Sequence, residues 1–114
     1  RYSGVISNRP ELSCLAVGAG SEAGERIAAF PFDEDYEEDL ESGIADIKQC
    51  TLEGGADHIH AARFLNRFIE NNVPWLHTDL SSSNRKGGLG AALSEVNGFG
   101  VGFGIQVLKK VLQK

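Results

Sequence analysis

The sequence predicts an α/β fold of three layers, in which helices pack on the few strands of a mixed sheet. Helical spacing of apolar residues recurs several times along the 114-residue chain, and an extended apolar stretch at residues 73–80 separates two such segments. Segments with strand character are short and scarce, so we expect only part of a sheet. The chain contains no methionine and begins abruptly at Arg1, from which we expect that it was cut from a longer polypeptide.

Composition and charge disfavour several classes of function. Hydrophobic residues make up 41% of the chain and charged residues 24%, which is ordinary for a soluble globular protein. The net charge of -5 argues against nucleic acid or an anionic membrane as a partner. No apolar run reaches the ~18 residues that a membrane-spanning helix needs. Cys14 and Cys50 form neither a CxxC pair nor a disulfide framework, so we expect reduced thiols in a cytoplasmic protein.

A first helix is expected after a short, weak strand at residues 2–7. Asn8 is a candidate N-cap, because Glu11 follows three residues later and Pro10 is tolerated in a first helical turn. Gly24 is expected to end the helix. The apolar residues between these ends recur at helical spacing: Leu12, Leu15, Ala16, Ala19 and Ala23.

A second helix is expected after a short extended stretch at residues 27–32. Pro31 lies in that stretch, so it is not expected to be a central strand. Asp35 with Glu38 has the spacing of a capping box, and the acidic run around them suits a helix start. One side of the expected helix carries the apolar residues Tyr36, Leu40, Ile44 and Ile47.

The third helix has the strongest pattern, and it begins after the break at Gly54-Gly55. One face is apolar at positions i, i+3, i+4, i+7 and i+8, namely Ala61, Phe64, Leu65, Phe68 and Ile69. The opposite, polar face carries Arg63, Asn66, Arg67 and Glu70. We expect Asn71-Asn72 to end the helix.

Residues 73–80 form the best predicted strand. Alternation places Leu76, Thr78 and Leu80 on one face. It places Trp75, His77 and Asp79 on the other. Both faces carry large side chains, which is typical of a strand that is covered on both sides.

A long, polar and glycine-rich loop at residues 81–98 precedes the last helix, which is expected at residues 99–112. Loops of this length in compact domains are usually functional or disordered. The helix carries an apolar stripe at Val101, Ile105, Leu108 and Leu112. Glycines at its start favour close packing against another backbone, and the alternative is that its first amides hold an anion.

The histidines are candidate metal ligands. On a helix His58 and His60 lie about 200° apart and cannot converge on one ion, so we expect surface positions for both. His77 and Asp79 share a strand face, but two ligands do not make a metal site, and structural hydrogen bonding is favoured. No GxSxG elbow supports a serine nucleophile.

Several short motifs, in a consistent order, resemble the leucyl aminopeptidase (cytosol aminopeptidase) family of metallopeptidases. The family's S-x-x-A-D-x-K-N run, GG element and A-A-x-F-L-x-x-F motif resemble residues 42–49, 54–55 and 61–68. Its W-x-H-x-D-[IL]-A-G strand is similar to residues 75–80, and its T-G-x-G-V-R motif to residues 98–101. Each motif alone is weak, and their order and spacing carry the resemblance.

A weaker similarity precedes these motifs. Gly24-Glu25-Arg26 and residues 31–36 resemble the family's G-E-x-x-W-x-x-P…Y stretch. The match is therefore weak before Gly24 and good from Ser42 to Leu108.

The resemblance implies that residues 1–114 are the C-terminal portion of a mixed α/β catalytic domain, with the metal-ligand segment missing upstream. Family members form hexamers and use two divalent metals, zinc or manganese, to activate a water that attacks the first peptide bond. The family's N-T-D-A-E-G-R-like ligand motif does not occur here. We therefore expect this fragment to hold no metal ligands and no catalytic residues and to be inactive alone, whereas the intact homo-oligomer acts on peptides.

The residues that follow the W-x-H-x-D strand line the family's pocket for the substrate's N-terminal side chain. The matching positions are Ser81 and Ser82, where the family usually has Ala-Gly, so a preference for apolar side chains is in doubt. Two alternatives stay open. One is a non-catalytic binding or assembly module that keeps the fold, and the weaker one is a metal hydrolase that uses His58, His60 and His77.

Overall fold

The chain folds around a sheet of three strands, β1 (Ser3–Ser7), β2 (Ile27–Ala29) and β3 (Leu76–Asp79), in the order β2-β1-β3. The structure is a computed structural model that describes residues 2–81, 84–88 and 93–113. β1 pairs in parallel with β2 and antiparallel with β3, so the sheet is mixed. This confirms the predicted α/β class with few strands.

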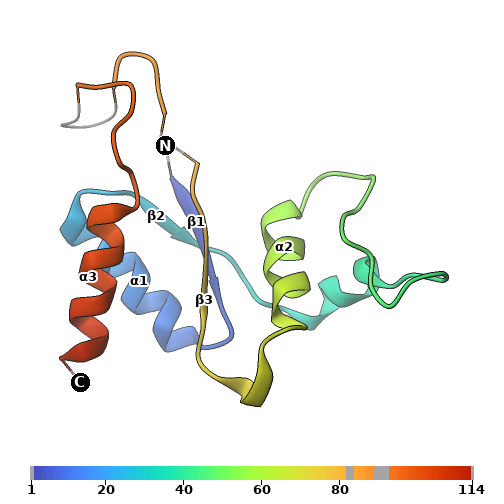
Figure 1. Ribbon diagram of the computed structural model, residues 1–114. Helices are drawn as coiled ribbons and strands as arrows, with labels where there is room; N and C mark the ends of the chain where they lie inside the picture. The colour runs from blue at the N-terminus through green and yellow to red at the C-terminus, as the bar shows by residue number, and fades with distance from the viewer. Residues whose placement is uncertain (1, 82–83, 89–92, 114) are drawn as a thin grey trace.

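Three α-helices cover the sheet in two layers. Helices α1 (Pro10–Ala23) and α3 (Val101–Leu112) lie side by side on one face, and α2 (Asp57–Asn66) lies on the other, as Figure 1 shows. Two short 3-10 helices, η1 (Glu34–Leu40) and η2 (Glu70–Asn72), flank α2 in the sequence. None of the helices in the described ranges is both long and apolar enough to cross a lipid bilayer.

β1 is the centre of the sheet, although its sequence predicts a weak strand. All five of its residues are buried, and Val5 and Ile6 are 0% exposed. β2 pairs with its residues 3–5 and β3 with its residues 4–7. Its stability therefore comes from tertiary pairing and burial and not from local propensity.

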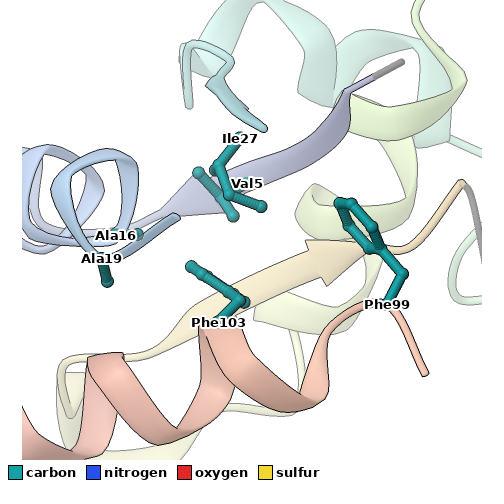
Figure 2. Close-up of a cluster of buried hydrophobic side chains, with 6 residues drawn as sticks. All are labelled: Val5, Ala16, Ala19, Ile27, Phe99 and Phe103. Carbon is teal, nitrogen blue, oxygen red and sulfur yellow. The ribbon is translucent and has the colours of Figure 1, made fainter. Parts of the chain in front are cut away.

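The core lies between the sheet and the α1–α3 layer. Figure 2 shows its members converging from four elements: Val5 of β1, Ala16 and Ala19 of α1, Ile27 of β2, and Phe99 and Phe103 at α3. Leu76 and Val107 pack against this cluster. Gly20 lets α1 approach β2, because a Cβ atom at that position would lie 2.3 Å from Ile27 Cγ1.

Helix α1 has the predicted span but not the predicted cap. Pro10 is at its first turn and Gly24 ends it with a φ of 70°. The N-cap position belongs to Arg9, which makes no side-chain capping bond. Asn8 instead donates from Nδ2 to the Val73 carbonyl (2.8 Å) and accepts from the Trp75 amide (3.0 Å), so it fastens the end of β1 to the entry of β3.

The predicted second helix is wrong beyond its first turns. Only η1 forms, and residues 41–56 contain neither helix nor strand. The expected capping box is absent too, because Asp33 is the N-cap and makes no side-chain capping bond. Ser42 Oγ accepts from the amides of Ile44 (3.3 Å) and Ala45 (3.0 Å), which is a local alternative to helical bonding.

Helix α2 buries a different face from the one that the apolar pattern predicts, and it ends at Asn66. Its buried residues are Ile59, His60, Ala62 and Arg63. The apolar pattern places Arg63 on the polar face, yet only 7% of it is exposed, whereas Phe68 is 64% exposed. The cause is η1, whose Glu37 accepts from Arg63 Nε at 2.6 Å, while the Phe32 ring lies 4.4 Å from the guanidinium carbon.

Candidate functional site at the end of strand β3

The exit of β3 is fastened to the entrance of β1. Because the two strands are antiparallel, with Gly4 opposite Asp79, the residue after β3 lies beside the start of β1. The Ser81 amide donates to Ser3 Oγ at 3.1 Å, and the Ser81 hydroxyl donates to the Tyr2 carbonyl. Figure 1 shows both chain segments meeting near the N-terminus. Ser82, the other predicted pocket residue, lies outside the described residues.

An exposed histidine–aspartate pair stands two residues before Ser81. His58, in the first turn of α2, bonds through Nδ1 to Oδ2 of Asp79. The two side chains are 50% and 35% exposed. The His58 ring centroid lies 5.4 Å from that of Phe30, and the Phe30 ring in turn lies over Gly4, where an added Cβ atom would be 3.0 Å from it.

His77 occupies the same face of β3 but has a different environment. Burial lowers the pKa of its imidazole below 6.5, with the charge of nearby His58 adding to this effect and Asp79 opposing it. Its Nε2 atom is buried without a hydrogen-bond partner. A neutral imidazole that packs 6.3 Å from the Trp75 ring is a structural residue of the strand.

His60 is buried, so the predicted surface position is correct for His58 and wrong for His60. Its Nε2 lies 2.8 Å from Asp39 Oδ2, and its ring packs edge-on against Tyr36. Only 8% of the residue is exposed. His58 and His60 point to different sides of α2, as the helical geometry predicts, and they pair with Asp79 and Asp39, respectively.

The described residues do not fit a divalent metal site. In the parts of the chain that the structure covers, no three His, Cys, Asp or Glu side chains converge in a way that could hold an ion. His58 lies near His77, but His60 pairs with Asp39 instead, so the three histidines do not converge on one point. Cys14 and Cys50 are free thiols on the surface.

The anion at the start of α3 is a carboxylate of the chain itself. Glu25 Oε2 accepts from the amides of Gly100 (3.0 Å) and Phe103 (2.9 Å), which are otherwise unpaired at a helix N-terminus. Glycine at position 102 leaves room for this carboxylate, since a Cβ atom there would lie 3.3 Å from Glu25 Oε1. The glycines do not pack against another backbone as predicted, because Gly100 and Gly102 face side chains and Gly104 has no described neighbour within 4 Å.

The turn at the start of α3 packs against the residue that follows β3. Gly100 has a φ of 103°, and an added Cβ would lie 2.9 Å from Leu80 Cδ2. Between these anchored ends the loop carries an antiparallel bridge of Asn84 with Val96. The candidate site is thus the segment between β3 and α3. Ser81 fixes one of its ends and Gly100 the other, and the His58–Asp79 pair lies next to Ser81.

Two interactions of this region have no signal in the local sequence. Glu25 belongs to a Gly-Glu pair, and nothing near it in the sequence indicates contact with a helix that starts 76 residues later. The His58–Asp79 pair joins an α2 residue to a β3 residue, and only the packing of α2 on the sheet reveals it. Cavities of about 340 and 390 Å³ lie elsewhere, and neither is lined by Ser81 or His58.

A family model and several relatives of known name identify the same protein family. The model described as "Cytosol aminopeptidase family, catalytic domain" matches residues 1–108. The probable cytosol aminopeptidase of Wolbachia pipientis wMel is 36% identical over 117 residues, which is 99% of this chain and 22% of its own length. That of Ehrlichia ruminantium (strain Gardel) is 42% identical over 82 residues, 71% of this chain and 16% of its own. The chain thus spans about a fifth of the length of these relatives.

Solved structures show the same architecture. The bottromycin maturation enzyme BotP superposes with a TM-score of 0.90 at 28% identity, covering 100% of this chain and 26% of its own. BotP in complex with Mn gives 0.88 at 28% identity, covering 97% of this chain and 25% of its own. A tomato leucine aminopeptidase mutant gives 0.83 at 25% identity, covering 96% and 21%.

The resemblance first carried by short motifs extends through the whole fold. The family match spans the sheet, all three helices up to residue 108, and the segment that joins β3 to α3. The superpositions cover the chain almost completely. The chain belongs to the cytosol aminopeptidase family, as part of its catalytic domain.

Proposed function

We propose that residues 1–114 form the C-terminal portion of the catalytic domain of a metal-dependent aminopeptidase, which hydrolyses the N-terminal peptide bond of peptides. The family match and the relatives' names support the activity. The chain spans only about a fifth of those relatives, so the activity belongs to the intact enzyme. We place that enzyme in the cytoplasm, because its relatives are cytosol aminopeptidases, and its hexameric assembly is an expectation from the resemblance.

The role of this segment is to form part of the wall that receives the substrate's N-terminal side chain. The observation that carries this proposal is the position of Ser81, which the Tyr2 carbonyl and Ser3 Oγ hold at the joined ends of β1 and β3. Ser82 follows it as the second proposed wall residue. Hydroxyl groups at positions where the family usually has Ala-Gly favour a polar or small N-terminal side chain over a large apolar one.

The catalytic metals are proposed to be held by another part of the intact enzyme. Two divalent ions, Zn or Mn, are expected there, and a BotP structure in complex with Mn supports metal dependence. The described residues of this segment do not fit such a site, since no three potential ligands converge. Ser81 and Ser82 therefore contribute to substrate binding and not to metal binding.

An activity assay tests whether this segment needs the rest of the enzyme for turnover. The 114-residue chain alone, incubated with a leucine anilide and Mn²⁺, should show no turnover above buffer. Addition of a complementary remainder should produce turnover; we define the remainder as the Wolbachia pipientis relative with its matching segment removed. Turnover by the chain alone would contradict the proposal, as would the absence of turnover from a reconstituted complex.

Substrate preference tests the pocket wall. In the reconstituted complex, Ser81→Ala should raise kcat/KM for N-terminal leucine relative to serine by up to about tenfold, because it removes a hydroxyl from the wall. Ser21→Ala, on the exposed side of α1, is the matched control and should leave the ratio unchanged. An unchanged ratio in Ser81→Ala would remove Ser81 from the pocket.

A further inference from the structure

Asn97 and Gly98 form the turn that leads into helix α3. The Phe99 amide donates to Asn97 Oδ1 at 2.9 Å, which closes an Asx turn over the Gly98 peptide. Gly98 has a φ of 63°, in the left-handed region that favours glycine, and its carbonyl accepts from the Val101 amide at 3.1 Å. The formation of this turn is one reason for the residue pair.

The same pair is also chemically reactive, because a main-chain nitrogen directly follows a side-chain amide. Attack of that nitrogen on Cγ of the asparagine closes a succinimide ring. A side chain on the following residue hinders the attack, and glycine has none. The other asparagines of the chain are followed by Arg, Asn or Val, so Asn97 is the one asparagine that a glycine follows.

The fold leaves Asn97 and Gly98 open to this reaction. Gly98 is exposed, and a Cβ atom at its position would meet no described residue within 4 Å, its chain neighbours aside. The Phe99 N–H that donates to Oδ1 stabilises the negative charge that develops on this oxygen during the attack. The same hydrogen bond keeps the side-chain amide beside the Gly98 peptide, so the reacting groups stay close together.

We propose that Asn97 is a site of spontaneous deamidation in the folded protein. The Gly98 nitrogen forms a bond to Asn97 Cγ and loses its proton to water. The Cγ–Nδ2 bond breaks, and Nδ2 takes up a proton and leaves as ammonia. Water then opens the succinimide at either carbonyl, which gives aspartate or isoaspartate at position 97. The reaction needs only water, involves no oxidation, and is independent of the proposed aminopeptidase function.

The isoaspartate product changes the start of α3. Its main chain runs through Cγ and is longer by a methylene group, so the side-chain oxygen that the Phe99 amide binds becomes part of the backbone. The Asx turn is lost in this product. Because the turn leads directly to Gly100 and Phe103, whose amides Glu25 accepts, we expect isoaspartate to loosen the start of the helix.

Peptide mapping tests the site. The 114-residue chain is incubated at mildly alkaline pH in water enriched in heavy oxygen, and its peptides are analysed by mass spectrometry. Aspartate and isoaspartate should accumulate at position 97, each with a heavy oxygen atom incorporated. Asn72 is the internal control, because it also has a positive φ but precedes Val73, and it should stay unmodified.

Asn97→Thr is the matched variant. The family motif T-G-x-G-V-R has threonine at this position, and a threonine hydroxyl can accept the same Phe99 amide but has no amide nitrogen to lose. The variant should give no product in this peptide. Absence of isoaspartate from the wild-type chain would overturn the proposal, because direct hydrolysis of the side chain gives aspartate alone.

Comparison with the urea-unfolded chain shows whether the folded turn itself reacts. If Asn97 reacted only after global unfolding, its rate in the folded chain would be lower by the unfolding equilibrium constant, about 10³-fold or more. A rate in the folded chain within about tenfold of the rate in urea supports the proposal, and a lower rate overturns it.

Urea unfolding of the product tests the effect on α3. The isoaspartate form, separated by chromatography, should unfold at a lower urea concentration than the fresh chain. Asn97→Thr, after the same incubation, should keep its original midpoint. An unchanged midpoint in the isoaspartate form would overturn the expected loosening of the helix start.

Discussion

At the scale of single residues, a few side chains connect segments that lie far apart in the chain. Asn8 joins the end of β1 to the backbone at Val73 and Trp75, and Glu25 holds the start of α3. Ser81 closes the other end of the β1–β3 pair. Each of these residues satisfies backbone groups that would otherwise lack partners, so each has an energetic role that its local sequence does not indicate.

Replacement of Glu25 tests the cap of α3. Glu25→Ala removes the acceptor of two amide bonds at a helix N-terminus and should lower the free energy of unfolding by about 1–2 kcal/mol. Glu22→Ala, which breaks the exposed ion pair with Lys110, is the control and should cost at most about 0.5 kcal/mol. Urea unfolding measures both, and equal losses would argue against a special role for Glu25.

The lowered pKa of His77 predicts a dependence of stability on pH. Well above pH 6.5 the imidazole is neutral in both the folded and the unfolded state and has no effect on stability. As the pH falls below 6.5, the unfolded chain binds a proton that the folded chain resists, so stability is lost until the lower folded pKa is passed. His77→Gln should therefore lose less stability than the wild type between pH 7.5 and 5.5 in urea unfolding. A parallel loss in both proteins would contradict this.

At the scale of elements, the sequence predicts helices and strands correctly where the apolar pattern extends over many residues. The structure contains α1, α2, β3 and α3 near their expected positions. The buried faces were harder to predict, because α2 and α3 carry large apolar residues on more than one side. Helical spacing of apolar residues identifies a helix. Which face of that helix is buried depends on the elements that pack against it.

The buried Arg63 of α2 provides a test of that choice of face. Arg63→Ala leaves Glu37 with fewer partners and removes packing on Phe32, so we expect a loss of about 3 kcal/mol in the free energy of unfolding. Arg67→Ala removes the more exposed partner of the same carboxylate and should cost at most about 1 kcal/mol. Thermal or urea unfolding of the two variants distinguishes the buried pair from the exposed one.

At the scale of the whole molecule, the accessible surface of 7615 Å² exceeds the roughly 6,100 Å² that a compact chain of 12.2 kDa exposes. Exposed apolar side chains are part of this surface, and they include Val101, Ile105, Leu108 and Leu112 of α3 and Leu65 and Phe68 next to α2. Surfaces of this kind are protein interfaces or sites of aggregation. The sheet also ends in short edge strands on both sides of β1, within the described residues.

The isolated chain should therefore self-associate. Light scattering at micromolar concentrations should give a mass above 12.2 kDa that rises with concentration, because uncovered apolar surface associates without fixed geometry. Leu108→Lys should reduce this association, and addition of the complementary remainder should prevent it. A monomer at all concentrations would contradict the prediction.

The sequence by itself determined the α/β class, the helical and extended segments with a long apolar period, and the family, because ordered motifs and periodicity are local properties of the chain. Tertiary structure alone decided that β1 is central, that residues 41–56 form no helix, that His60 and Arg63 are buried, and that Glu25 caps α3. The physical reason is the same in each case. Burial and the pairing of polar groups depend on partners distant in sequence, and η1, β3 and the start of α3 become neighbours of these residues only in the folded chain.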